Sequence, residues 1–254
     1  LVVAVRAGQI QAMSELLGEG SRPQLRSADA SADRSARERF LRAYEEAHAL
    51  EREGEGRLVL QLGKDAWRFP FPLVKAGAAW RVDGRAGSEE ILNRKIGRNE
   101  LAAVQACQAY VDAQREYYLA NPARGPLLQY ARRIRSSEGK RDGLYYPAKP
   151  GEAPSPLGPH YQGTKGAPYH GYHFRVLQAQ GPDAPGGAYN YLVNGRMIGG
   201  FALVAYPAAY GKSGVMSFLV NHAGVIYEKD LGPEGAAAAA RMTRFNPDKS
   251  WKRL

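Results

Sequence analysis

The chain has 254 residues, of which 44% are hydrophobic and 24% charged, and this composition is typical of a folded domain and excludes a disordered one. It holds no apolar run of the about 18 residues that a membrane-spanning helix needs, and its single cysteine, Cys107, excludes an internal disulfide and a cysteine-based zinc site. Residues 1–92 carry 14 Lys/Arg and 14 Asp/Glu, whereas residues 93–254 carry 21 and 11. The net charge of +10 therefore lies in the second part, which indicates two domains and favours either general solubility or an anionic partner for the second.

Residues 1–87 are predicted to form a small α+β domain of cystatin-like or cone-shaped form. The apolar residues of "VVAVRAGQIQAMSELL" recur at helical spacing, and a second helix is expected to begin near Asp33. The segments "RLVLQL", "AWRFPFPLV" and "AWRVD" are separated by turn residues and predict a three-stranded antiparallel meander. Pro70 and Pro72 indicate a bulge or an edge in the middle strand, because proline cannot donate a hydrogen bond to a neighbouring strand.

Residues 88–98 are predicted to form a linker helix that stops at Gly97, and residues 99–254 a second domain. Asn99 is expected to cap a long helix whose apolar stripe includes Cys107 as a core residue. Asn121-Pro122 is expected to start another helix through Ile134. The sequence then predicts a Pro/Gly-rich loop at 139–170.

From Gly171 onward the pattern is one of strands and turns. Alternating segments such as "YHFRVLQAQ", "FALVAYP" and "VMSFLV" predict an antiparallel sheet, and Asn194-Gly195 predicts a tight hairpin. "GAAAAARMT" predicts a short final helix. The expected fold class is therefore α+β, with N-terminal helices on a small antiparallel meander followed by a long helix packed on an antiparallel sheet.

The stretch "GKSGVMSFLVNHAGVIYEKDLG", residues 211–232, resembles two catalytic motifs without matching either. A phosphate-binding loop needs a glycine where Tyr206 stands, and a helix after the lysine, where this chain has strand-like residues. Neither Ser213 nor Ser217 lies in the G-x-S-x-G frame of a serine hydrolase. The stretch instead predicts a hairpin with "NHAG" as its turn and His222 at a solvated tip.

Ten of the fifteen tyrosines fall between Tyr145 and Tyr227 and are interleaved with Lys and Arg. Because mobile loops on a rigid sheet are a common binding arrangement, the 139–170 loop and the neighbouring turns are the expected contact surface. The candidate binding residues are Arg141, Lys149, Tyr161, Tyr169, His170, Tyr172 and His173.

Two other kinds of site stay open at this point. A metal-assisted hydrolase would use His170 and His173 with His222 or Asp230, although residues three apart on a strand point to opposite faces. Binding of nucleic acid or an anionic surface is the other alternative, although the sequence has no signature of a nucleic-acid-binding module. Neither metal nor cofactor is part of the favoured interpretation.

Three long segments resemble a bacterial family known as domain of unknown function 2950. They are "WRVDGRAGSEEILNRKIGRNELAAVQACQAYVDAQREYY", the run from "YHGYHFRV" to "YEKDLG", and the tail "MTRFNPDKSW". The resemblance covers nearly the whole chain and implies a bacterial protein made with an export signal, hence periplasmic or secreted, but no established activity. The second half is also similar in layout to the globular heads of type IV pilin-like proteins, in which a helix packs on an antiparallel sheet.

The resulting prediction is a non-catalytic binding or scaffolding protein of the bacterial envelope, with a protein or a glycan as partner. The chain lacks a starting Met, so we expect it to be a mature or trimmed form.

Overall fold

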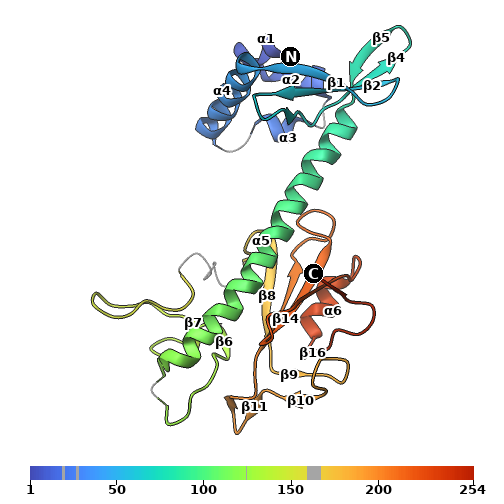
Figure 1. Ribbon diagram of the computed structural model, residues 1–254. Helices are drawn as coiled ribbons and strands as arrows, with labels where there is room; N and C mark the ends of the chain where they lie inside the picture. The colour runs from blue at the N-terminus through green and yellow to red at the C-terminus, as the bar shows by residue number, and fades with distance from the viewer. Residues whose placement is uncertain (19–20, 27–28, 124, 159–166) are drawn as a thin grey trace. The chain divides into compact units, whose positions relative to one another are not determined.

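The computed structural model describes residues 1–254 except 19–20, 27–28, 124 and 159–166 (Figure 1). Contacts divide the chain into two compact units, unit 1 from Leu1 to Arg94 and unit 2 from Lys95 to Leu254. No helix in the described part of the chain is both long and apolar enough to cross a membrane.

Unit 1 is an α+β unit of short helices and a small antiparallel sheet. Its helices are α1 (Val2–Arg6), α2 (Ile10–Leu17), α3 (Arg22–Leu25) and α4 (Ala30–Glu46). Its strands are β1 (His48–Arg52), β2 (Arg57–Leu62), β3 (Trp67–Arg68), β4 (Leu73–Ala76) and β5 (Ala79–Val82). The sheet has the order β1-β2-β4-β5, and β3 pairs with β2. Val5 and Met13 are buried against Phe40 and Leu41 of α4, so the helices share one apolar core.

All three segments predicted to form the antiparallel meander of unit 1 do form it. The sheet also contains a further strand that the sequence did not indicate. Pro70 and Pro72 divide the middle segment into β3 and β4, as proline in a strand requires. The added strand, β1, pairs with β2 along its whole length although it is mostly exposed. Because both of its faces carry polar or exposed side chains, it lacks the alternation that identifies a half-buried strand. Asp29 starts α4 by accepting hydrogen bonds from the N–H groups of Ser31 and Ala32.

A single helix, α5 (Gly84–Ala120), replaces the expected linker helix and the helix after it. The predicted stop at Gly97 is wrong: this residue is exposed in the helix interior, where a glycine costs only about 1 kcal/mol relative to alanine. Asn99 is not a cap, because its side-chain amide donates to the Ser213 carbonyl oxygen at 2.8 Å. The helix therefore continues through this single exposed glycine.

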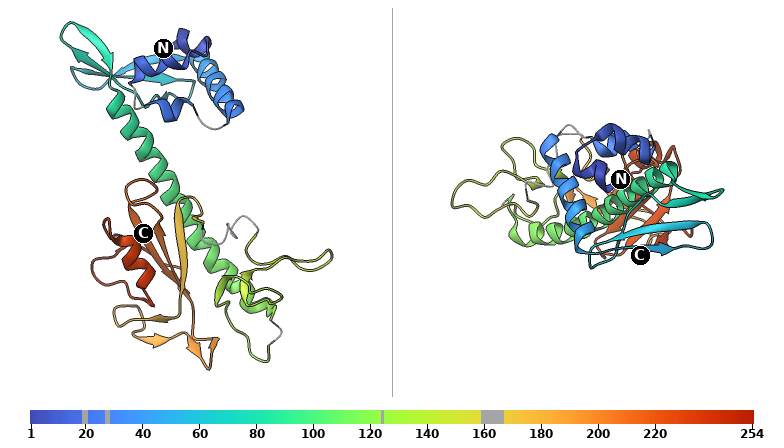
Figure 2. Two further views of the ribbon diagram at one scale, coloured as in Figure 1. Left: turned by 180° about the vertical axis from the view of Figure 1, so that it is seen from behind. Right: turned by 90° about the horizontal axis from the view of Figure 1, so that it is seen from above.

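Unit 2 contains the second half of α5 and a five-stranded antiparallel sheet. The strands are β8 (Tyr172–Leu177), β13 (Ala202–Pro207), β14 (Met216–Asn221), β15 (Ile226–Asp230) and β17 (Lys252–Arg253), in the order β17-β15-β14-β13-β8. Helix α5 covers one face of this sheet, and α6 (Gly235–Arg241) packs on β13 (Figures 1 and 2). The predicted α+β class and the long helix on an antiparallel sheet are therefore confirmed.

Shorter strands surround this sheet. β6 (Arg133–Arg135) pairs in parallel with β7 (Gly143–Tyr145), and β11 (Leu192–Val193) forms a hairpin with β12 (Arg196–Met197). β9 (Ala179–Gln180) lies between β10 (Tyr189–Asn190) and β16 (Arg244–Phe245). The hairpin turn at Asn194-Gly195 is confirmed, and both of its residues have the positive φ that this turn type requires.

The core of unit 2 forms between α5 and the sheet. Cys107 and Val111 of α5 are buried in one cluster with Leu203 and Phe218 of the sheet. Burial raises the pKa of the Cys107 thiol to about 12. Cys107 is therefore the core residue that its place on the apolar stripe predicts, and it stays a neutral thiol at physiological pH.

A buried glutamine ties the chain that follows α5 back onto the helix. The Gln114 amide donates to the Ala131 carbonyl oxygen at 2.9 Å and accepts from the Ala131 N–H at 2.8 Å. It also donates to the Tyr110 hydroxyl, which in turn donates to the Ala202 carbonyl oxygen of β13. The described residues between Asn121 and Ile134 do not form the expected helix, because Asn121 takes a left-handed conformation (φ 44°) and the backbone at 131 is bonded to Gln114.

We expect Gln114→Ala to lower the free energy of unfolding by about 2–4 kcal/mol, because it leaves both backbone groups of Ala131 buried without a partner. Urea unfolding followed by circular dichroism measures the loss. Gln108→Ala, at an exposed position of the same helix, is the matched control and should change stability by less than about 0.5 kcal/mol. Equal losses in the two variants would contradict the anchoring role of Gln114.

Candidate functional site

The three histidines of the alternative metal site do not come together. His170 is exposed in the turn before β8, and His173 lies opposite Tyr206 in the register of β8 and β13. His222 follows β14 and its N–H donates to the carbonyl oxygen of Phe201, just before β13 begins. The five steps along the extended chain from residue 201 to residue 206 span about 16 Å, so His222 lies at the opposite end of the sheet from His173. Among the described residues, no group of three or more His, Cys, Asp or Glu side chains is placed to hold a metal ion.

The tyrosines of the predicted surface differ in their exposure. Tyr172 is fully buried, its hydroxyl donates to the Met216 carbonyl oxygen at 2.8 Å, and burial raises its pKa. It is a core residue that a ligand in solution cannot reach, which corrects its place in the predicted surface. Tyr169 is half-buried, with its ring 4.4 Å from the His170 ring. Tyr161 lies outside the described residues.

Arg141 and Lys149 lie in a part of unit 2 that is remote from His170. The Arg141 carbonyl oxygen accepts a hydrogen bond from Tyr117 near the end of α5, whereas Gly171 faces Asn99 near the middle of that helix. Tyr117 lies 18 positions after Asn99, a rise of about 27 Å along the helix. The predicted contact surface is therefore not one continuous site in the described part of the chain.

The Arg141 side chain forms an ion pair within its own loop. Its guanidinium lies 2.6 Å from a carboxylate oxygen of Glu152 and 5.0 Å from the centre of the Tyr146 ring. The backbone N–H of Lys149 donates to the same carboxylate at 3.2 Å. These contacts order the loop and leave less cationic charge for a ligand.

The hydroxyl and carboxylate groups of residues 211–232 have structural roles. Ser213 exchanges hydrogen bonds with the N–H and the carbonyl oxygen of Ala209, and Asp230 accepts from the Tyr210 hydroxyl at 3.0 Å. The segment forms the hairpin β14–β15, as predicted, and its turn is closed by the Gly224 N–H and the Asn221 carbonyl oxygen. No Ser-His-Asp arrangement results.

His222 is half-buried, which corrects the expectation of a solvated tip. Its ring lies 5.7 Å from the Tyr191 ring and 6.2 Å from the Phe201 ring, and its Nδ1 is buried without a hydrogen-bond partner among the described residues. Burial lowers the pKa of the imidazole. Gly200 has φ 145° and lies so close that a Cβ there would stand 2.7 Å from Nδ1, so only glycine fits beside this ring.

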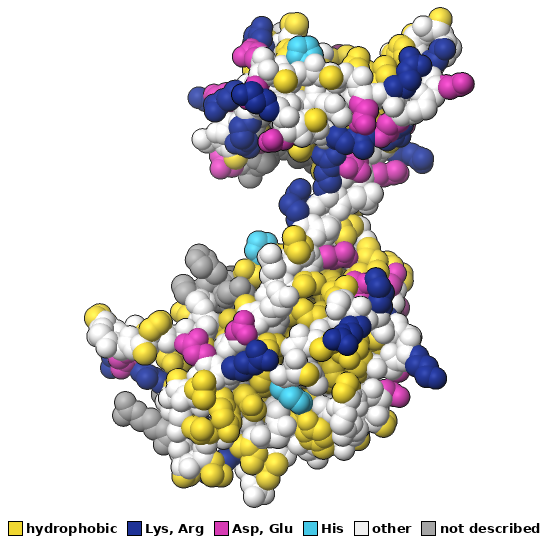
Figure 3. All heavy atoms as spheres, in the orientation of Figure 1, with side chains coloured by type: hydrophobic (Ala, Val, Ile, Leu, Met, Phe, Trp, Pro, Cys, Tyr) yellow, Lys and Arg dark blue, Asp and Glu magenta, His cyan; other side chains and the backbone are white. Residues whose placement is uncertain are grey.

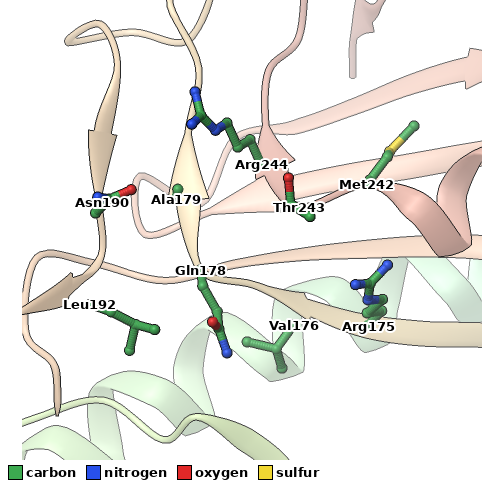
Figure 4. A pocket seen from close by; sticks show the side chains of 9 residues that line it. All are labelled: Arg175, Val176, Gln178, Ala179, Asn190, Leu192, Met242, Thr243 and Arg244. Atoms are coloured by element: carbon green, nitrogen blue, oxygen red, sulfur yellow. The ribbon is translucent and has the colours of Figure 1, made fainter. Parts of the chain in front are cut away.

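Unit 2 contains a polar groove of about 530 Å³ that the sequence did not indicate, which we call the Arg175–Arg244 groove (Figure 4). Asn190 and Leu192 stand on one side of it, and Met242 and Thr243 on the other. Its lining residues are Arg175, Val176, Gln178, Ala179, Asn190, Leu192, Met242, Thr243 and Arg244. They come from β8 to β11, from β16 and from the segment after α6.

The two arginines give the groove a positive charge. One N–H of Arg175 donates to the Ala240 carbonyl oxygen near the C-terminal end of α6, which fixes the guanidinium and leaves its other N–H groups available. Arg244 is exposed on β16, opposite Ala179 of β9. Neither arginine forms an ion pair with any described residue, and none of the described lining residues is acidic.

A buried glutamine holds one wall of the groove in place. The Gln180 amide donates to the carbonyl oxygens of Pro185 and Gly187 at 2.8 and 2.7 Å, and its oxygen accepts from the Tyr191 hydroxyl at 2.8 Å. The connection between β9 and β10 is thus fastened, and Asn190 is presented from a fixed backbone. The Asn246 side chain bonds to Asp183 in the same connection.

The sequence carries no signal that joins Arg175 to Arg244. The two residues are 69 positions apart and belong to no motif, and the parallel pairing of β16 with β9, the strand that follows β8, brings them to one groove. Such long-range pairing cannot be read from local periodicity.

These features define an α+β protein whose second unit is a helix-covered antiparallel sheet with an arginine-lined groove at its edge. The chain belongs to the family described as protein of unknown function DUF2950, whose model matches residues 1–254. No curated protein and no solved structure matches the chain, so the likeness to pilin-like heads stays a prediction from the sequence.

The lowered pKa of His222 predicts how stability depends on pH. In the unfolded chain the His222 imidazole takes up a proton near pH 6.5, whereas in the folded protein it does so only at a lower pH. The contribution of His222 to the free energy of unfolding is therefore complete above about pH 6.5 and is lost as the pH falls below that value. We expect His222→Gln to flatten this part of the stability profile between pH 7.5 and 5. Urea unfolding at several pH values measures it.

His170→Asn is the control for this experiment, because His170 is exposed and asparagine tolerates its positive φ. The control should keep the wild-type profile. A wild-type profile in His222→Gln as well would show that His222 does not titrate differently in the folded and unfolded states.

Proposed function

We propose that the protein is a non-catalytic binding protein of the bacterial envelope, periplasmic or secreted, and that its Arg175–Arg244 groove binds an acidic glycan. The observation that carries the proposal is the presence of two arginines without a carboxylate partner among the described residues in one polar groove. Guanidinium groups bind carboxylate and phosphate oxygens through paired hydrogen bonds, which neutral ligands cannot accept with the same strength.

The remaining lining suits the neutral part of a sugar. Asn190, Gln178 and Thr243 supply amide and hydroxyl groups that both donate and accept, as sugar hydroxyls require. Leu192 and Met242 supply apolar contacts for C–H groups. A volume of about 530 Å³ is within the range of small-ligand sites, about 300–1,000 Å³, and holds a short segment of a glycan.

The lining favours binding over catalysis. Apart from the two arginines, none of the lining side chains among the described residues ionises, so the groove lacks a general acid or base. Among the described lining residues, no imidazole or carboxylate accompanies the Thr243 hydroxyl that could activate it. These features disfavour the hydrolase alternative for this groove.

The groove also suits a glycan better than nucleic acid. None of the described lining residues is aromatic, whereas single-stranded nucleic acid is bound by stacking its bases on aromatic rings. On the face of unit 2 drawn in Figure 3, the Lys and Arg side chains stand in separate groups, with Asp and Glu among them, and do not form a continuous basic stripe. An extended phosphate backbone would need such a stripe.

The proposal is tested on an array of glycans that are neutral, carry a uronic acid carboxylate, or carry a phosphate, with a single-stranded oligonucleotide beside them. We expect binding to acidic glycans only. Arg244→Gln should weaken it about 10- to 100-fold, because a hydrogen bond to a charged group contributes about 1.5–3 kcal/mol.

Arg253→Gln is the matched control, since it removes the same charge from an exposed position of β17 outside the groove. It should leave binding unchanged. Equal weakening by both variants, binding to neutral glycans, or binding to the oligonucleotide alone would contradict the proposal.

A further inference from the structure

Unit 1 contains a second concavity, of a different chemical kind. Its volume is about 280 Å³, and most of its lining is apolar. The walls come from α1, α2, α4 and α5 and from the segment that joins β3 to β4, through Val5, Met13, Leu17, Phe40, Phe71 and Ile91. We call it the apolar cavity of unit 1.

The floor of the apolar cavity is inaccessible to solvent, while its mouth is open. Met13, Leu17 and Phe71 are buried, whereas 51% of the Trp67 surface at the rim is exposed. Water gains few hydrogen bonds in such a space, because most of the lining side chains are apolar. An apolar ligand would recover the dispersion contacts that the wall atoms lack.

The volume of the apolar cavity and the flexible side chains at its floor favour an acyl chain as the ligand. The cavity is nearly twice as large as an apolar cavity of about 150 Å³ that binds benzene, so a single ring would leave it partly empty. Met13 and Leu17 at the floor are flexible aliphatic side chains that adapt to an unbranched chain. A chain of medium length fills the space.

The rim supplies one cation for the head group of such a ligand. Arg37 of α4 is half-buried at the lining and forms no ion pair with a described residue. Asp33, one helical turn earlier, also lines the cavity, but it already has a partner of its own. Arg94, whose guanidinium lies 5.4 Å from the centre of the Trp67 ring, is paired with Glu90 at 2.7 Å.

We propose that unit 1 binds a medium-chain fatty acid, with the acyl chain in the apolar cavity and the carboxylate at the Arg37 guanidinium. The charge at the rim and the apolar depth together select an anionic amphiphile over a neutral or cationic one. This site is separate from the Arg175–Arg244 groove and does not depend on the function proposed for it.

Isothermal titration of the full chain tests the proposal with octanoate, nonanoate and decanoate, each below the concentration at which it forms micelles. We expect saturable binding of one molecule per chain, with an affinity that rises roughly fourfold for each added methylene. Decyltrimethylammonium, which has the same chain and a cationic head, should bind at least tenfold more weakly than decanoate.

Two substitutions locate the ligand. Ala36→Trp, at an exposed position of α4 that lines the cavity, should fill the space and weaken decanoate binding at least tenfold. Arg37→Gln should weaken decanoate about tenfold and leave the ammonium compound unaffected. Arg39→Gln, an exposed position two residues along α4 and hence on another face of the helix, is the matched control and should bind like the wild type.

Several results would overturn the proposal. Absence of saturable decanoate binding, or unchanged binding in a folded Ala36→Trp variant, would show that the cavity takes no acyl chain. Equal affinity for decanoate and decyltrimethylammonium would contradict the role of Arg37. Dimerisation in sedimentation experiments that Ala36→Trp abolishes, without decanoate binding, would assign the cavity to a second copy of the chain.

Discussion

The packing of the second half of α5 against the five-stranded sheet is the interaction on which unit 2 depends. Cys107 and Val111 bury the apolar stripe of the helix, and polar side chains at its edges fix where neighbouring segments attach. Glu100 accepts hydrogen bonds from the N–H groups of Val215 and Met216 at the start of β14, at 2.8 and 3.0 Å. Gln114 holds the returning chain at Ala131. A mostly apolar interface thus gains directional contacts that set one arrangement.

The Arg175–Arg244 groove forms where this rigid sheet ends. β8 is an edge strand of the main sheet and supplies Arg175, while the chain continues into β9, whose other neighbours are β10 and β16. Gln180 fastens the connection that carries Asn190, and α6 accepts a hydrogen bond from Arg175. The groove side chains therefore project from a backbone that hydrogen bonds hold in place. This reduces the conformational entropy that the protein loses when a ligand binds.

Local patterns in the sequence were sufficient to predict the turns and strand interruptions that depend on a few neighbouring residues. Asn194-Gly195 predicted its hairpin because both residues tolerate positive φ. Pro70 and Pro72 predicted a bulge or an edge in the middle strand, at the place where the chain divides into β3 and β4. The helix stop predicted at Gly97 was wrong because a helix tolerates one exposed glycine. The solvated position predicted for His222 was wrong because the aromatic residues that bury it, Tyr191 and Phe201, are distant in sequence. For the same reason the groove could not be predicted, since its two arginines line one groove through pairing between strands far apart in the chain.

The most direct test of the account is a nuclear magnetic resonance titration of unit 2 in the intact chain with an acidic oligosaccharide such as oligogalacturonate. If the Arg175–Arg244 groove binds acidic glycans, the side-chain amide signals of Asn190 and Gln178 and the guanidinium signals of Arg175 and Arg244 will shift together and saturate. Shifts confined to the loop that carries Arg141 and Lys149, or no saturable shift with any acidic glycan, would contradict it.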